Sequence, residues 1–207
     1  MLIASYNPAQ LGDVLVVLLH QDTPKQVVKR AGGDIVEISS EEDGTVLGGY
    51  NFFNVSEYLG KMGTGQIFLT AAQLENLQQQ LEQVGFTTKL ELDRTPKFVV
   101  GYVEELKEHP DSDHLHITKT RISATEVLQI VCGAPNIAAG QLVVVAKVGA
   151  MMPNGEIIWP GKLRGVESDG MICSARELEL PHAPQKRGGI LVLSATKYQV
   201  GASFALK

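Results

Sequence analysis

The stretch Gly161-Lys-Leu-Arg-Gly-Val-Glu-Ser-Asp-Gly-Met-Ile-Cys-Ser-Ala-Arg-Glu-Leu178 carries the densest local structure signals in the chain. Lys162, Leu163 and Arg164 alternate polar and apolar side chains, which predicts a strand with both cations on one face. Residues 167–170 predict a turn, because their Asp-Gly pair tolerates a positive φ. A cationic strand followed by a tight turn is therefore expected.

The end of the same stretch predicts a buried strand and the start of a helix. Met171-Ile-Cys173 is a short apolar run, typical of a core strand. Ser174 and Glu177 have the spacing of a capping box, in which each side chain bonds the other residue's amide. Fixed basic and polar groups on such a small β scaffold favour recognition over catalysis.

The composition is that of an ordinary globular protein with an uneven charge. The 207 residues are 44% hydrophobic and 20% charged, which fits one large or two small domains. The net charge of −5 argues against wholesale nonspecific binding of nucleic acid. Residues 1–95 hold 6 Lys and Arg against 12 Asp and Glu, whereas residues 96–207 hold 12 against 11. A local cationic face on the second half is compatible with this balance.

No apolar run in the sequence reaches the length of a membrane span, and no basic segment precedes an apolar one at the N-terminus. We therefore expect a cytoplasmic protein with no membrane partner. Cys132 and Cys173 lie in apolar surroundings, and two buried free thiols fit a reducing compartment better than a disulfide does.

The first half predicts an α+β domain over residues 1–90, whose role the sequence does not reveal. Short apolar runs between turn residues predict five strands: Leu2–Tyr6, Val14–His20, Val27–Arg30, Ile35–Ser39 and Val46–Phe52. Val55–Leu59 predicts one helical turn ended by Gly60.

The clearest helix signal is Thr70–Val84. Thr70 and Gln73 fit a capping box, and Gly85 suits the left-handed position after the last turn. Apolar residues spaced three and four apart form one stripe: Leu74, Leu77, Leu81 and Val84. The stripe favours packing on the N-terminal sheet, and a dimer seam, hence a homodimer, is the alternative.

A polar segment ending in Pro96 marks a boundary, so a second domain is expected over residues 91–207. Short runs predict its strands: Lys97–Leu106, Thr118–Ile122, Val127–Val131, Leu142–Val148, Glu156–Trp159 and Gly189–Leu193. Many short strands with little helix indicate a small closed all-β barrel.

Five histidines and aspartates gather before the second of these strands: His109, Asp111, Asp113, His114 and His116. Their spacing matches no familiar metal site, and no CxxC or HExxH motif accompanies them. An Asx-type turn at Pro110-Asp-Ser-Asp113 is the expected structure, and no metal or other cofactor is predicted.

Four motifs in this half resemble one known family in order and spacing. They are His109-Pro-x-x-Asp113-x-Leu115, Ile130-Val-Cys-Gly-Ala-Pro-Asn136, Gly165-Val-Glu-Ser-x-Gly-Met-Ile-Cys-Ser174 and Glu177-Leu178. The match is to the tRNA-binding OB-fold domain of bacterial phenylalanyl-tRNA synthetase β chains, of some methionyl-tRNA synthetases and of endothelial-monocyte-activating-polypeptide type proteins. An unrelated N-terminal part followed by this domain resembles the YtpR-like family of bacterial tRNA-binding proteins.

The resemblance implies an OB-fold domain that binds the folded outer corner of tRNA, with little choice among tRNAs and without the catalytic bulk of a synthetase. The chain departs from the family pattern at three places. Asp111-Ser112 stands for the usual Asn-Ala, His114 for a frequent Lys or Arg, and Glu179 for a Gly that would ease a left-handed helix end.

Six residues are candidates for RNA contact: Asn136, Lys162, Arg164, Ser168, Met171 and Ser174. Lys162 and Arg164 could bind backbone phosphates, or could simply form a solvated strand face. Ser168 and Ser174 offer hydroxyls near that face, although Ser174 already serves as a cap.

The remaining two candidates have equally plain structural alternatives. Asn136 could bond a base edge or a sugar, or its own turn backbone. Met171 could pack against a base, or belong to the core. The expected function is non-catalytic tRNA binding through the shape and backbone of the RNA. The alternative is a protein-binding or export-chaperone-like module using the same barrel. An enzyme is disfavoured, because no constellation for acyl transfer, phosphoryl transfer or metal-assisted hydrolysis is found.

Overall fold

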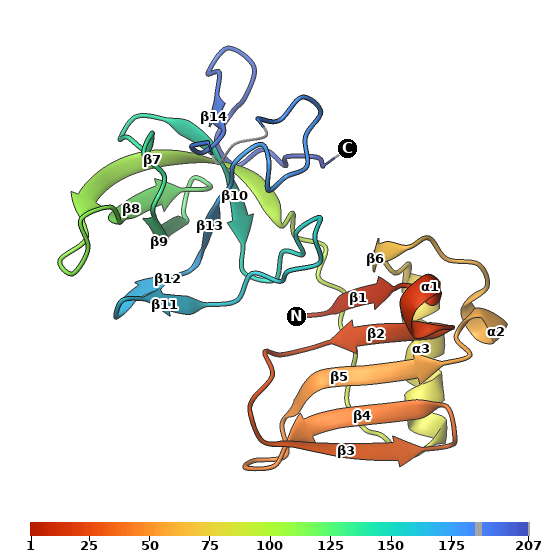
Figure 1. The fold of residues 1–207 in the computed structure, drawn as a ribbon. Coiled ribbons are helices and arrows are strands. Elements are labelled where there is room, and N and C mark those ends of the chain that lie inside the picture. Colours follow the sequence, from red (N-terminus) through yellow and green to blue (C-terminus); the bar gives the residue numbers. More distant parts are fainter. Residues whose placement is uncertain (185–187, 207) are drawn as a thin grey trace. The chain divides into compact units, whose positions relative to one another are not determined.

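The computed structural model describes residues 1–184 and 188–206, and the chain divides into two compact units between Arg94 and Thr95 (Figure 1). Both units are built mainly from strands, with few helices. Among the described residues, no helix is both long enough and apolar enough to cross a membrane.

The N-terminal unit is built on one antiparallel sheet with the strand order β3-β4-β5-β2-β1-β6. Its strands are β1 (Ile3–Tyr6), β2 (Val14–Leu18), β3 (Gln26–Ala31), β4 (Ile35–Ser40), β5 (Val46–Phe53) and β6 (Gly65–Ile67). The five predicted strands all form, and the most continuously apolar one, β2, lies inside the sheet. The short helix α1 (Pro8–Leu11) and strand β6 were not expected from the sequence.

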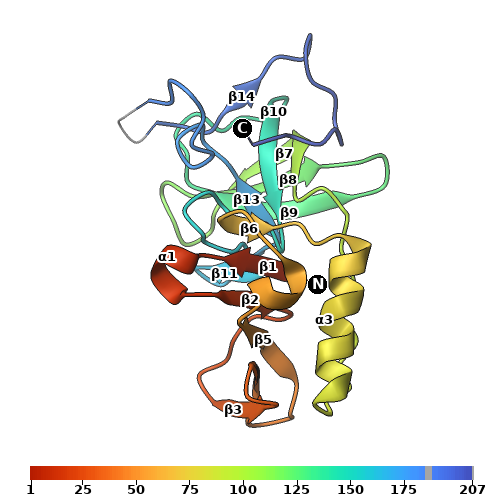
Figure 2. The ribbon, with the colours of Figure 1, turned by 90° about the vertical axis from the view of Figure 1, so that its right-hand side faces the viewer.

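One helix, α3 (Ala71–Gln83), covers one face of this sheet (Figures 1 and 2). Its predicted capping box is confirmed: Gln73 N donates to Thr70 Oγ1 over 3.2 Å, and Thr70 N donates to Gln73 Oε1 over 3.0 Å. Leu77 and Leu81 are fully buried in the core of the unit, with Leu74 and Val84 packed against it. The apolar stripe is thus used inside the unit, so the alternative of a dimer seam along it is wrong.

The short helix α2 (Ser56–Leu59) ends at Gly60, as its sequence predicts. Gly85, after α3, has a φ of 88° and lets the chain leave the helix in the left-handed conformation.

The C-terminal unit contains a five-stranded sheet with the order β13-β10-β7-β8-β9. Its strands are β7 (Phe98–Glu108), β8 (His116–Arg121), β9 (Val127–Cys132), β10 (Leu142–Lys147) and β13 (Gly170–Ile172), and β14 (Val192–Leu193) pairs with β10. The long β7 pairs with β10 over residues 98–102 and with β8 over residues 102–108, and the ladder with β8 has an irregularity between Val103 and Glu105. Asp169 N donates to Gln129 O over 2.9 Å, which brings the start of β13 back to β9.

Strand β10 forms the wall between two apolar cores. Val143 and Val145 point into a core with Ile130 and Ile172, whereas Val144 and Ala146 point into a second core on the other side. The alternation of a strand explains this division, because successive side chains lie on opposite faces.

Residues 156–159, predicted as a strand, form only one bridge, between Met151 and Ile157. Pro160 comes directly after them, and a proline cannot donate to a ladder, so the pairing stops there.

Candidate nucleic-acid interface

The first part of the stretch 161–178 forms a separate two-stranded hairpin of β11 (Gly161–Leu163) and β12 (Val166–Ser168). Its turn is Arg164-Gly165, with φ values of 46° and 85°. Two successive positive φ angles give a turn whose twist suits a hairpin. The predicted turn at 167–170 is therefore wrong, because the chain already reverses at Arg164-Gly165.

The hairpin also shows that the two cations do not share one strand face, as the sequence predicted, because only Lys162 lies in a strand. Lys162 lies on β11 opposite Glu167, with 3.4 Å between Lys162 Nζ and Glu167 Oε1. Arg164 lies in the turn, and its Nη1 donates to Asp111 O over 2.8 Å. Both side chains are exposed, so the hairpin presents one cation on its strand and one at its tip.

Ser168 is not at the surface. The residue is only 4% exposed, and its hydroxyl accepts from Val131 N over 3.1 Å and donates to Gly170 O over 3.2 Å. These bonds join β12 and β13 to β9, so the structure gives Ser168 a structural task in place of the expected exposed hydroxyl. Met171 pairs with Ala146 and is half-buried against the second core.

Ser174 begins a single helical turn. Ser174 N donates to Glu177 Oε2 over 2.7 Å, and Glu177 N donates to Ser174 Oγ over 3.2 Å, so the predicted capping box is confirmed. The turn ends at once, with Glu179 in the left-handed region at a φ of 48°. Glu179 therefore adopts the strained conformation that a glycine would ease.

Asn136 uses its side chain to hold a distant backbone. Its amide nitrogen donates to Ile190 O over 3.0 Å, and its amide oxygen accepts from Ile190 N over 2.8 Å. A side chain at Gly189 would collide with this amide, so the pair depends on the glycine. The Asn136 side chain thus joins its loop to the backbone at Ile190 by two hydrogen bonds, and does not bond the backbone of its own turn.

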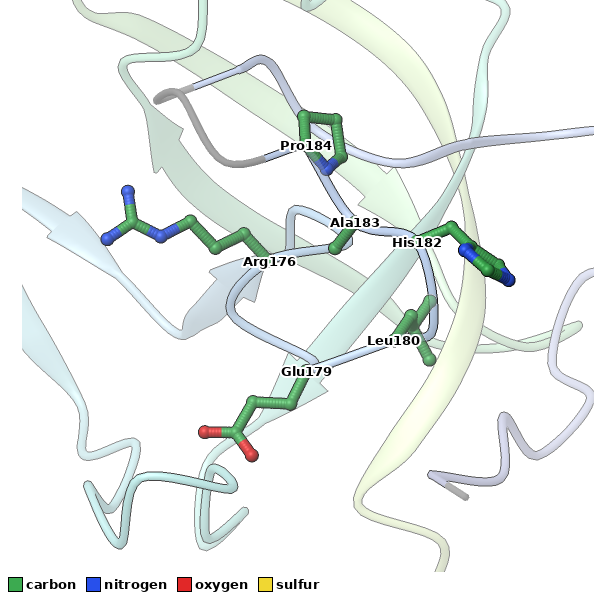
Figure 3. Close-up of a pocket in the computed structure, with 6 residues that line it drawn as sticks. All are labelled: Arg176, Glu179, Leu180, His182, Ala183 and Pro184. Atoms are coloured by element: carbon green, nitrogen blue, oxygen red, sulfur yellow. The ribbon is translucent and has the colours of Figure 1, made fainter.

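Arg176 was missed by sequence reasoning. Two cavities of about 270 Å³ each lie beside it. The first is lined by Arg176, Glu179, Leu180, His182, Ala183 and Pro184, and Figure 3 shows Arg176 and His182 pointing to opposite sides of this loop. The second extends from Ser174 and Arg176 to the apolar residues 190–192. The sequence contained one indication of this position, because Arg176 follows the capping Ser174 by two residues and so lies in the first turn beside the other candidate residues.

Charge pairing distinguishes Arg176 further. Most of the Lys and Arg side chains that the structure describes in this unit lie within 4 Å of a carboxylate: Lys107, Lys119, Arg121, Lys147 and Lys162. Within residues 95–184 and 188–206, Arg176 and Lys197 have no ion pair or hydrogen bond from their side chains. Their charges are thus available to an anionic partner.

The two cysteines are buried and free, as predicted. Burial raises the pKa of both thiols, that of Cys173 to about 12. The histidine–aspartate segment does not form a metal site: the described residues contain no group of three or more His, Cys, Asp or Glu side chains placed to hold an ion.

Comparisons with known proteins find two family matches, one in each unit of the chain. A family model described as "Putative tRNA binding domain" matches residues 98–201, and a domain family of unknown function matches residues 21–93. A Bacillus subtilis protein named "Putative tRNA-binding protein YtpR" is 45% identical over 97% of this chain and 98% of its own length.

Other matches cover one part of the chain. The phenylalanine–tRNA ligase beta subunit of Oceanobacillus iheyensis is 56% identical over 42% of this chain, which corresponds to only 11% of that subunit. The solved C-terminal domain of Plasmodium vivax p43 is 24% identical, with a TM-score of 0.36, over 54% of this chain and 61% of that one. Identity along nearly the full length of both chains is found with YtpR, and this chain belongs to the YtpR-like family of tRNA-binding proteins.

Proposed function

We propose that this protein binds tRNA without catalysing a reaction on it, and that the C-terminal unit, an OB-fold barrel, makes the contact. The observation that carries the proposal is the match to a tRNA-binding protein over 98% of that relative's length. The ligase beta subunits extend far beyond the shared domain, so their activity does not transfer to this chain.

The sheet of the C-terminal unit supports an OB-type barrel. Five strands in the order β13-β10-β7-β8-β9, with Asp169 N returning to Gln129 O, bring the two ends of the sheet together. Small barrels of this kind commonly bind single strands and irregular RNA.

The proposed contacts are mainly with phosphates. Lys162 and Arg164 extend from the hairpin, and Arg176 lies beside two cavities with its charge unpaired. Met171 and Ser174 would border the RNA, and Asn136 would support the loop at Ile190. Such contacts position an RNA without reading its sequence, which agrees with little choice among tRNAs.

The test replaces Lys162 and Arg164 together with Ala. Each lost phosphate contact removes about 0.7–0.9 from the magnitude of the log–log salt slope, so the slope should fall by nearly two units. Affinity for total bacterial tRNA should weaken by about 2–4 kcal/mol at low salt, taking about 1.5–3 kcal/mol for each charge-assisted bond with a discount for exposure. The measurement is tRNA affinity at several salt concentrations.

Arg176 has a matched control in Lys197, the other cation within residues 95–184 and 188–206 whose side chain forms no ion pair or hydrogen bond. Arg176→Gln should reduce the slope by about one contact, while Lys197→Gln, at a residue that lines neither cavity, should leave the slope unchanged. Equal effects of both variants would reduce Arg176 to one charge among many.

Absence of tRNA binding by the unmutated protein, even at low salt, would defeat the proposed function and bring forward the protein-binding alternative.

A further inference from the structure

The segment between β7 and β8, residues 109–115, is a turn held by its own side chains. Asp111 N donates to His109 Nδ1 over 3.1 Å, and Leu115 N donates to Ser112 Oγ over 3.3 Å. The expected turn is present, but a histidine and a serine supply these acceptors in place of the aspartates.

His109 is only 3% exposed, and both of its ring nitrogens are engaged. Because Nδ1 accepts from Asp111 N, the ring proton lies on Nε2. The Nε2 proton is then donated to Leu163 O, 3.1 Å away at the end of β11. One neutral tautomer satisfies both bonds, and no other protonation state does.

A second bond crosses in the opposite direction. Arg164, next to Leu163, donates from Nη1 to Asp111 O over 2.8 Å. The loop thus bonds the hairpin backbone through His109, and the hairpin bonds the loop backbone through Arg164. We call these two bonds the clamp. Among the described strands, β11 pairs with β12 alone, so the clamp adds two bonds that join the tip of the hairpin to the rest of the unit.

We propose that His109 is a positioning residue for RNA, which holds the hairpin so that Lys162 and Arg164 meet phosphates in a fixed geometry. The inference rests on the proposed function. Arg164 has five N–H donors, so the bond to Asp111 O leaves others for a phosphate. Fixing a binding element before association reduces the ordering cost of binding.

Two near-isosteric substitutions separate the two bonds of the ring. His109→Gln places an amide N–H near the Nε2 position and retains the bond to Leu163 O. His109→Asn places its amide oxygen near the Nδ1 position. This variant therefore retains the acceptor for Asp111 N and loses the bond to Leu163 O in the hairpin. We expect H109Q to keep tRNA affinity within about twofold, and H109N to weaken it by about 2- to 12-fold, the equivalent of one hydrogen bond of about 0.5–1.5 kcal/mol.

A double-mutant cycle distinguishes positioning from a general loss of structure. In protein already carrying Lys162→Ala and Arg164→Ala, H109N should have no further effect on tRNA affinity, because the groups that it positions are absent. An equal loss in both backgrounds would overturn the proposal, as would equal affinities of H109N, H109Q and the unmutated protein.

The clamp is also measurable without RNA. NMR of the imidazole should show a proton on Nε2, and hydrogen exchange at the hairpin amides should accelerate in H109N but not in H109Q. Unchanged exchange in H109N would overturn the clamp. Loss of tRNA binding by the unmutated protein would instead defeat the proposed function, whatever the exchange shows.

Because His109 is buried, the melt of H109N is checked first. If it is not cooperative, Arg164→Lys tests the other half of the clamp at an exposed position. This variant keeps the charge but loses the planar guanidinium. We expect weaker tRNA binding with an unchanged salt slope, and unchanged affinity would overturn the clamp's role.

Discussion

Leu69–Leu74 and Cys173–Leu178 share one pattern at the start of a helix, yet only the first continues as one. Each has a buried apolar residue, a hydroxyl cap, an Ala, a Gln or Glu three residues after the cap, and a leucine that packs in the local core. Both capping boxes are complete. The first leads into the 13 residues of α3, whereas the second stops after one turn.

The two segments also end alike. Phe86 N donates to Leu81 O over 2.9 Å, and Leu180 N donates to Ala175 O over 3.0 Å, each across a residue in the left-handed conformation. That residue is Gly85 in one case and Glu179 in the other.

The difference between the two segments lies in the residues after the first turn. Helix α3 continues its apolar stripe through Leu77 and Leu81, which are buried against the sheet. After Leu178 the chain reaches Pro181, which disfavours helical geometry at the residue before it. Local capping therefore sets where a helix begins, and the stripe and the next proline set its length.

The largest expected effect is the loss of the stripe. Leu81→Ala should cost about 2–5 kcal/mol of unfolding free energy and shorten α3, because it opens a cavity under a fully buried side chain. Leu178→Ala should have a similar cost but no effect on helix content. Urea unfolding with far-UV circular dichroism measures both, and an unchanged helix signal in L81A would break the comparison.

The two caps should have similar value although the helices that they begin differ in length. Thr70→Ala and Ser174→Ala should each cost about 1 kcal/mol, since each leaves a helical amide without its side-chain acceptor. Chemical denaturation gives the free energies. A cost for S174A far below that for T70A would mean that the value of a cap depends on the helix after it.

The left-handed ends should respond with opposite signs. Glu179→Gly should stabilise the protein by about 0.5–1 kcal/mol, because relief of about 1–2 kcal/mol of strain exceeds the added entropy of the unfolded chain. Gly85→Ala should destabilise it by about the same amount, although no atom lies near the new Cβ. Equal signs in denaturation midpoints would contradict this reading of the two turns.

The effect that is smallest at neutral pH concerns the apolar residue before each cap, which is Leu69 in one case and Cys173 in the other. Burial raises the pKa of Cys173 to about 12, so the native thiol should not react with a thiol reagent at pH 8. Since the unfolded thiol ionises near pH 8.5, the unfolded state binds fewer protons above that pH. Stability should therefore fall as pH rises from about 8.5 toward 12.

The control for that experiment is denatured protein without reductant, which should show two reactive thiols. Rapid modification of the native protein at pH 8 would place Cys173 in an accessible site.

Much of the fold is readable from local pattern. Alternation and apolar runs predict β1 to β5 and β7 to β10, and the capping pair at Thr70 with Gly85 predicts both ends of α3. The sequence does not predict β6, because three residues carry too little pattern and their strand depends on pairing with β1.

The candidate site was less predictable. The Asp-Gly pair at 169–170 predicted a turn, but the turn of the hairpin lies at Arg164-Gly165. Residues 166–168 form β12, which is bonded to β9 through Ser168 Oγ and Val131 N, and the sequence does not show this long-range bond. The bond from His109 to Leu163 O joins residues 54 positions apart. Such pairings arise from the tertiary fold and leave no local pattern.

Strand β10 has a consequence for cooperativity. Residues Val143, Val144, Val145 and Ala146 are all fully buried, two facing each core, and the strand pairs with β7, β13 and β14. Neither core can lose this wall and keep its packing, so the two should melt as one unit. The amides of β10 should then be the last of this unit to exchange with solvent, opening only when the whole unit unfolds.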